Sequence, residues 1–297
     1  MNPSNSATLP VEGLAPIAPV VTLVEVTDAE LNKYATLIYE RTGIRVSPQK
    51  KTLLSNRLRR RLRETGIPSF GAYYEHLRKL SPQDPEWEGF LQEITTHETY
   101  LFRDNGQWDW FRKVYLPHLA AEAQGGQRRQ TLRIWSAACS TGDEAFTIAT
   151  CVAACLPNYK AWQVQIVGTD IDAGAVEQAR SGQFAERAMR QVPAEYRKKY
   201  FQRTPAGVYQ ASPPLMQLTS FKRHNLLDRL RDNPFDIVFL KNVLIYFTPE
   251  SKRRALDHIR SAIVPGGLLV AGPTEGISDL VRDYTRLQPW LYRRPMQ

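Results

Sequence analysis

Two acidic side chains stand where a helical pattern begins after a short turn. The hydrophobic run 132–137 leads into this turn, which contains Gly142 and is followed by Asp143 and Glu144. A strand, a compact turn and a helix in this order form the ligand crevice of open α/β sheets. Turns that bind phosphate are rich in glycine and expose several backbone N–H groups. Because carboxylates here would repel a phosphate, the turn predicts a ligand with hydroxyl groups and positive charge.

S-adenosylmethionine (SAM) has these properties, since it carries a sulfonium, an amino group and a ribose but no phosphate. A second acid supports this prediction, because Asp170 ends the hydrophobic run 164–169. An acid at the tip of the second strand of such a sheet can accept hydrogen bonds from both ribose hydroxyls. The alternative for Asp170 is a helix N-cap. Its spacing from the turn at Gly142 favours ribose binding, and Asp143 is expected to serve the helix start.

A third group of polar side chains follows the hydrophobic run 235–240. Lys241 and Asn242 come directly after it, and Tyr246 stands where the next helix begins. If the strands are parallel, these residues face the same crevice as Asp170. The alternative for Tyr246 is a core aromatic residue whose hydroxyl is hydrogen-bonded.

The segment 94–103 concentrates hydroxyl groups, an imidazole and a guanidinium ahead of the first expected strand. Arg103 has the planar fork that binds a carboxylate through two hydrogen bonds, which a lysine lacks. The alternative for Arg103 is a salt bridge between domains. His97 has no triad partners nearby in the sequence, and we assign it no catalytic role.

One expected helix, residues 50–65, is strongly basic. Leu54, Leu58 and Leu62 recur at helical spacing and predict its buried side, so the basic residues are expected on the outer surface; these are Lys50, Lys51, Arg57, Arg59, Arg60, Arg61 and Arg63. Exposed helix faces normally alternate in sign, and like charges one turn apart destabilise a helix by about 0.2–0.5 kcal/mol per pair. An unbalanced basic face predicts an anionic partner.

The elements that must position these groups form two domains. Residues 24–95 predict an all-helical domain, whereas residues 96–297 alternate strands and helices as a parallel α/β sheet requires. The expected strands of this Rossmann-like sheet are 132–137, 165–169, 235–240 and 267–271. Residues 189–221 predict a small antiparallel β-subdomain insertion, with a helix at 194–200 and extended runs at 207–211 and 216–218. Residues 1–22 predict a disordered leader.

Composition limits the function classes. The 297 residues carry a net charge of +9, which suits an acidic partner such as nucleic acid, an anionic membrane or an acidic protein surface. No apolar run approaches the roughly 20 residues that span a bilayer, and the sequence does not open like a secretory signal. The three cysteines, Cys139, Cys151 and Cys155, lack nearby histidines and predict buried thiols rather than a metal site. We expect a cytoplasmic protein without membrane insertion.

Together these segments resemble the chemotaxis receptor methyltransferases of the CheR type, from about Leu31 to about Tyr292. The segments that carry the resemblance occur in the order and spacing of that family: Thr95–Arg103, Ile134–Ile148, Thr169–Asp172, Asn225–Leu226 and Asn242–Phe247. The family transfers a methyl group from SAM to glutamate side chains on receptor cytoplasmic helices. Its other product is S-adenosylhomocysteine (SAH).

The resemblance implies a role for each matching position. The residues implied to form the cofactor site are His97, Thr99, Arg103, Glu144, Asp170, Asn225, Leu226, Lys241 and Asn242. Among these, Asp170 would hold the ribose, and Asn225 and Leu226 would flank the adenine. Arg103 and Tyr246 are implied to be catalytic and to align the substrate carboxylate. The basic helix is implied to dock the receptor through Arg57, Arg60, Arg61 and Arg63.

The sequence departs from the usual family pattern in three places. His97 stands where the family commonly has asparagine, and Lys241 where it commonly has arginine. The last strand ends Ala-Gly-Pro-Thr-Glu at 271–275 rather than in Gly-His-Ser-Glu. The turn at 203–208 is also short and lacks the glycine-flanked extension of members that grip a receptor-tail pentapeptide. This predicts docking that does not depend on the pentapeptide.

Two other functions are compatible with parts of the sequence. A nucleic-acid methyltransferase would explain the basic charge, but the Asn/Asp-Pro-Pro-aromatic motif of such enzymes is replaced by residues 241–246. We therefore expect no nucleic-acid partner. A non-catalytic SAM-binding regulator would explain the departures at His97 and Lys241. Methyl transfer to receptor fragments distinguishes these possibilities.

Overall fold

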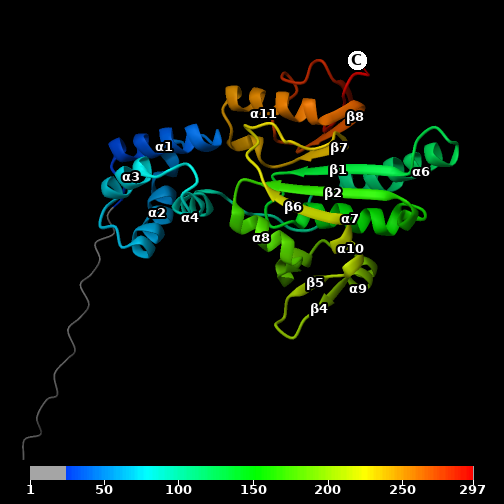
Figure 1. The fold of residues 1–297 in the computed structure, drawn as a ribbon, viewed down its shortest axis with the longest axis horizontal. Helices are drawn as coiled ribbons and strands as arrows, with labels where there is room; N and C mark the ends of the chain where they lie inside the picture. Colours follow the sequence, from blue (N-terminus) through cyan, green and yellow to red (C-terminus); the bar gives the residue numbers. More distant parts are fainter. Residues whose placement is uncertain (1–24, 297) are drawn as a thin grey trace, which may run out of the picture.

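The computed structural model describes residues 25–296. The leader predicted at residues 1–22 lies outside the described residues. A small domain of helices α1 to α4 lies beside a larger α/β domain (Figure 1). No helix among residues 25–296 is long and apolar enough to cross a bilayer.

The N-terminal domain packs four helices around one core. They are α1 (Asp28–Thr42), α2 (Lys51–Thr65), α3 (Phe70–Lys79) and α4 (Glu86–Ile94), with a 3₁₀ turn at Pro48–Lys50 before α2. Helix α1 begins at a capping box, in which Thr27 accepts the N–H of Glu30 and the Glu30 carboxylate accepts the N–H of Thr27. The core includes Tyr34, Leu58, Tyr73, Leu77 and Phe90, all buried. The helical domain predicted from periodicity is confirmed.

The large domain is built on a seven-stranded sheet with the order β6-β2-β1-β7-β8-β10-β9. The parallel part contains β1 (Thr131–Ala137), β2 (Gln163–Asp170), β6 (Thr219–Arg223), β7 (Phe235–Leu240) and β8 (Ile263–Ala271). Two antiparallel strands, β9 (Thr285–Gln288) and β10 (Leu291–Arg293), extend one edge. All four strands expected from hydrophobic runs are present. Their continuous apolar character reflects burial on both faces of the sheet.

Helices cover both faces. They are α5 (Asn105–Trp110), α6 (Leu116–Gln124), α7 (Asp143–Cys155), α8 (Ala173–Ser181) and α11 (Pro249–Ala262), with a π-helical segment at Phe111–Tyr115 between α5 and α6. Successive residues of β7 alternate between two cores: Phe239 packs with residues of α5 and α7, and Val238 packs with residues of α11. In Figure 1, α11 lies above the sheet, and α7 and α8 lie below it.

The small antiparallel sheet has the order β3-β5-β4, with β3 at Gln183–Phe184, β4 at Phe201–Arg203 and β5 at Tyr209–Ala211. Helix α9 (Ala194–Tyr200) lies between its strands in the sequence and has the predicted bounds. The predicted extended run 216–218 is wrong, because it forms the end of α10 (Pro213–Leu218). Two prolines at the first positions of α10 favour a helix start there. Phe221, also assigned to the insertion, belongs to β6 of the large sheet.

The two domains meet just after α1. Gly43 ends α1 with a φ of 72°, and a Cβ atom there would lie 2.9 Å from Ser251 Oγ of the large domain. Only glycine combines this left-handed backbone with so close an approach. Ile44 then forms an antiparallel bridge with Phe247, and the N–H of Arg45 donates to the carbonyl of Tyr246 at 2.8 Å. We call residues 43–45 with 246–247 the domain joint.

Candidate cofactor and substrate site

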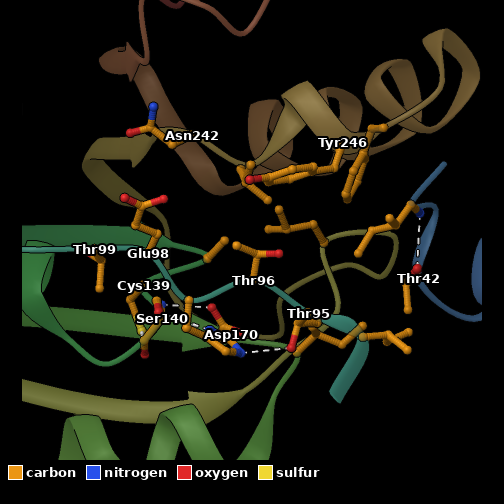
Figure 2. Close-up of a pocket in the computed structure, with 18 of the residues that line it drawn as sticks. Thr42, Thr95, Thr96, Glu98, Thr99, Cys139, Ser140, Asp170, Asn242 and Tyr246 are labelled. Atoms are coloured by element: carbon orange, nitrogen blue, oxygen red, sulfur yellow. Dashed lines mark hydrogen bonds between the residues drawn. The ribbon is translucent and has the colours of Figure 1, made fainter. Parts of the chain in front are cut away.

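One pocket lies between the two domains, where β1, β2 and β7 end. It is lined by every residue that the sequence assigned to cofactor or catalysis: His97, Thr99, Arg103, Glu144, Asp170, Asn225, Leu226, Lys241, Asn242 and Tyr246. The helical domain adds Thr42, Lys50, Leu53 and Arg57 to the lining. Figure 2 shows Cys139, Ser140 and Asp170 on one side of the pocket, with Tyr246 across from them.

Asp170 forms the floor of the pocket. Its carboxylate accepts the backbone N–H of Ser140 at 2.8 Å and that of Asp172 at 3.1 Å, and the residue is 6% exposed. Burial raises the pKa of Asp170, although these N–H groups and His97 favour the charged form. The N-cap role considered for Asp170 is filled by Asp172, which accepts the N–H of Gly174 at 2.7 Å. Asp170 is therefore held in one orientation at the tip of β2, as a ribose acceptor requires.

Glu144 lies in the first turn of α7 beside the end of β1. Its carboxylate accepts the Ser136 hydroxyl at 2.8 Å and lies 3.8 Å from Lys241 Nζ. Burial raises the pKa of Glu144, and the nearby Lys241 ammonium opposes that shift. Asp143 is buried beneath the turn and accepts the Thr141 hydroxyl at 2.6 Å, while Gly142 occupies the N-cap position. Of the two acids, Glu144 lines the pocket.

His97 links the inter-domain segment to the floor. Its Nε2 lies 2.7 Å from Asp172 Oδ2, and its Nδ1 lies 3.0 Å from the Ser140 hydroxyl. Burial opposes protonation, but the hydrogen bond to Asp172 and the charges of Asp170 and Asp172 raise the pKa of His97. The same bond lowers the pKa of Asp172 against the effect of burial. His97 thus buttresses the turn that holds Asp170.

Arg103 sits in an unusual backbone segment. Its neighbours Phe102 and Asp104 both have left-handed backbones, with φ values of 59° and 65°. The Arg103 carbonyl accepts the Trp108 indole N–H at 2.6 Å, and its guanidinium donates to the Glu98 carbonyl at 2.8 Å. Left-handed non-glycine residues cost on the order of 1–3 kcal/mol and cluster at functional sites. The surrounding contacts hold this strained segment so that Arg103 lines the pocket.

Lys241 is buried at the end of β7, with 3% of its side chain exposed. Its Nζ donates to the Arg103 carbonyl at 3.1 Å and lies 3.2 Å from Asp104 Oδ2. The ammonium also lies 4.7 Å from the centre of the Trp108 ring. Lys241 therefore neutralises the acids around it and fixes the Arg103 segment.

Three pocket side chains keep their polar groups available. Within residues 25–296, the side chains of Thr99, Asn242 and Tyr246 make no hydrogen bond to the protein. Asn225 differs, because its amide donates to the Arg41 carbonyl at 2.9 Å and accepts the N–H of Leu227 at 3.0 Å. Asn225 therefore joins the end of α1 to the pocket wall, and Leu226 beside it offers an apolar surface.

The basic helix is arranged differently from the prediction. Arg61 is not on the outer surface: its side chain is 14% exposed and pairs with Glu86 of α4 at 2.5 Å. Arg60 pairs with Glu93 of α4 at 2.7 Å. The sequence pattern of one helix cannot show that a neighbouring helix supplies its acids. Arg63 is exposed as expected.

Arg57 points toward the pocket rather than outward. Its guanidinium donates to the Ile94 carbonyl at 2.6 Å and to the Thr96 hydroxyl at 2.9 Å. Sequence reasoning assigned Arg57 to docking and did not assign Ser140, Thr96 or Leu53 to the pocket. Ser140 could have been found from its place within the turn. The contribution of α2 could not, because it depends on how the domains pack.

The donor set fits SAM. Two acids face the pocket, the buried Asp170 and the half-buried Glu144, and the described residues contain no cluster of acids, histidines or cysteines suited to a metal ion. Lys241 Nζ lies 3.2 Å from Asp104 Oδ2 and 3.8 Å from Glu144 Oε2, so these two carboxylates already neutralise its ammonium. Asp170 suits the ribose hydroxyls and Leu226 suits a flat apolar base. A cationic cofactor with hydroxyl groups matches these side chains better than a phosphate does.

Comparisons with known proteins identify both domains. Residues 29–95 match the CheR methyltransferase all-alpha domain, and residues 97–289 match the CheR methyltransferase SAM-binding domain. The chemotaxis protein methyltransferase of Escherichia coli is 33% identical over 265 residues, which cover 87% of this chain and 88% of that protein.

Two further relatives give similar values. The chemotaxis protein methyltransferase of Salmonella typhimurium is 32% identical over 87% of this chain and 88% of its own. Chemotaxis protein methyltransferase 1 of Pseudomonas aeruginosa is 33% identical over 88% of this chain and 95% of its own. The chain therefore belongs to the CheR methyltransferase family, with an all-alpha domain followed by a SAM-binding domain.

Proposed function

We propose that this protein transfers a methyl group from SAM to glutamate carboxylates on the cytoplasmic helices of chemoreceptors. The products are a glutamate methyl ester and SAH. The observation that carries this proposal is the shared pocket, in which the acids suited to SAM lie beside Arg103 and Tyr246. A cytoplasmic location follows from the proposed substrate.

The residues have the task of orienting the substrate. A glutamate side chain has a reference pKa near 4.3 and is ionised at neutral pH, so it needs no general base. SAM supplies an electrophilic methyl group on its sulfonium. Arg103 binds the substrate carboxylate, and the Tyr246 hydroxyl helps to align it by a hydrogen bond. Because full neutralisation of the carboxylate would weaken it as a nucleophile, the sharing of the Arg103 guanidinium with the Glu98 carbonyl suits this role.

The mouth of the pocket supports an acidic helical substrate. Lys50 and Arg57 of the N-terminal domain line it together with Leu53, whose side chain is exposed. Lys50 Nζ lies 5.2 Å from the centre of the Tyr246 ring, so its charge is close to the proposed catalytic group. Arg60 and Arg63 extend this basic face outward. Arg61 is assigned to packing within the helical domain. Docking by exposed charges should weaken as salt is raised.

Docking is proposed to be independent of a receptor-tail pentapeptide. The turn that joins β4 and β5 is closed by the N–H of Thr204, which donates to the Val208 carbonyl at 2.8 Å. This short hairpin supports the proposal because it leaves no extension to grip a peptide. Receptor fragments with and without a C-terminal pentapeptide should be methylated at similar rates.

The test is methyl transfer from radiolabelled SAM to receptor cytoplasmic fragments, with nucleic acid as a parallel substrate. Base-labile label on the receptor supports the proposal. Label in nucleic acid contradicts it, as does SAM binding without transfer to any receptor of the source organism.

A further inference from the structure

A buried carboxylate holds the segment that presents Asn242 and Tyr246. Glu275 follows β8, has no exposed surface, and accepts the backbone N–H of Asn242 through Oε1. Asn242 has a left-handed backbone with a φ of 58°. An asparagine in this conformation persists when its surroundings fix it. Glu275 itself does not line the pocket, so it acts through the segment it holds.

Backbone N–H groups converge on the Glu275 carboxylate. Burial raises the pKa of Glu275, but the N–H groups of Asn242, Val243 and Leu244 oppose that shift. Several N–H groups directed at one carboxylate form an anion-binding nest in which the charge strengthens each hydrogen bond. Lys252 adds a further contact, since its Nζ donates to the Glu275 carbonyl at 2.6 Å. The loop after β8 and the start of α11 are thus joined.

The chain also leaves room for this carboxylate. A Cβ atom at Gly272 would lie 2.6 Å from Glu275 Oε1 and 3.1 Å from the Asn242 nitrogen. Real Cβ atoms do not approach oxygen this closely, so a methyl group at position 272 would displace the Glu275 carboxylate from the N–H of Asn242.

We propose that Glu275 is a positioning residue for methyl transfer. Its carboxylate fixes the backbone of residues 242–244 and thereby sets the places of the Asn242 amide and the Tyr246 hydroxyl in the pocket. This inference rests on the proposed function for the reaction itself. The reaction is sensitive to such positioning because a displacement of about 1 Å can cost roughly 100-fold in rate.

The experiment compares Glu275→Ala, Glu275→Gln and the neighbouring control Thr274→Ala, whose side chain is exposed. Hydrogen–deuterium exchange of the peptide 241–247 and SAH affinity are measured without receptor, and kcat and KM are measured with a receptor fragment. Glu275→Ala should exchange faster in this peptide and lose about 100-fold in kcat, with a smaller change in the receptor KM. Glu275→Gln keeps an acceptor oxygen and should recover to within about tenfold of the unmodified protein. Thr274→Ala should match the unmodified protein in each measurement.

Gly272→Ala is an independent variant. It tests the positioning role of Glu275 if Glu275→Ala does not fold. It should also speed exchange at 241–247 and lower kcat, because its methyl group displaces the carboxylate. Unchanged exchange and kcat in Glu275→Ala and Gly272→Ala overturn the proposal, and so does a Glu275→Gln variant as defective as Glu275→Ala. If the unmodified protein transfers no methyl group, the proposed function fails, while exchange and SAH affinity still decide the role of Glu275.

Discussion

The Nζ atom of Lys241 lies 3.1 Å from the carbonyl oxygen of Arg103, so the end of β7 holds the backbone that presents the proposed substrate-binding guanidinium. The same ammonium faces the carboxylates of Asp104 and Glu144. Lys241 therefore carries both a structural bond and the balancing charge. Two predicted site residues, one after β7 and one before α5, act as a unit.

Replacing Lys241 with methionine should disable this unit. Removing one member of a buried charge cluster commonly costs about 3–5 kcal/mol, because the remaining acids lose their partner. We expect a lower free energy of unfolding and little methyl transfer. Lys241→Arg should restore most of both, since the guanidinium can reach the same acceptors. Denaturant unfolding and the transfer assay measure these effects, and normal transfer by Lys241→Met would contradict the assigned role.

Arg103→Ala tests substrate orientation. The Arg103 side chain donates only to the Glu98 carbonyl among the hydrogen bonds within residues 25–296, so its loss should leave the fold intact. Methyl transfer should become undetectable, while SAH affinity should fall much less. Calorimetry with SAH separates the two effects. Transfer near the unmodified rate would show that another group orients the carboxylate.

The pair formed by His97 and Asp172 predicts a pH dependence of stability. The hydrogen bond to Asp172 raises the pKa of His97 above its ordinary value of 6.5, even though burial opposes this. The folded protein therefore binds this proton more tightly than the unfolded chain does. The resulting stabilisation is fully present below pH 6.5 and is lost as the pH rises through the raised pKa.

His97→Asn removes this titration. The free energy of unfolding of the unmodified protein minus that of the variant should shrink as pH rises from about 6 to about 8.5. Denaturant unfolding at several pH values measures the difference. A difference that stays constant over this range would show that the pair does not stabilise the charged imidazole.

Arg61 and Arg63 of α2 should have different roles: Arg61 stabilises the helical domain, and Arg63 contributes to receptor docking. Arg61→Ala leaves Glu86, 15% exposed at its side chain, without its charged partner and, within residues 25–296, with only the Tyr73 hydroxyl to donate to it, and should lower the free energy of unfolding by about 1–3 kcal/mol. Arg63→Ala, at an exposed position, should change stability by less than about 0.5 kcal/mol. It should instead weaken receptor binding, most clearly at low salt. Equal unfolding midpoints for the two variants would contradict this division.

The sequence predicted strands and helices best where a single pattern, such as a long apolar run, marked the segment. The run 235–240 became β7 with the expected bounds, because a strand buried on both faces reads as continuous apolar sequence. The run 216–218 was too short for its alternation to outweigh the prolines at 213 and 214, which begin α10. Short apolar segments do not distinguish strand from helix by periodicity alone.

The sequence predicted which residues line the pocket, but it did not predict the hydrogen bonds and ion pairs between them. Strand ends meet at one edge of a parallel sheet, which is why Asp170 and Asn242 could be placed together. The partners of each residue depend on tertiary packing, so the bond from Lys241 to the Arg103 carbonyl had no sequence signal. Arg61 shows the same limit in its bond to Glu86, which lies 25 residues away on another helix, whereas its pair with Glu64 is three residues away on α2 itself.

The domain joint means that this enzyme is not assembled from interchangeable modules. The N–H of Arg45 donates to the carbonyl of Tyr246, so a receptor helix docked on α2 as proposed would contact a domain whose backbone is hydrogen-bonded to the proposed catalytic tyrosine. A hybrid that carries the helical domain of another family member would inherit a different mouth and a different setting of Tyr246. Changing which receptor is recognised would therefore also change how fast it is methylated.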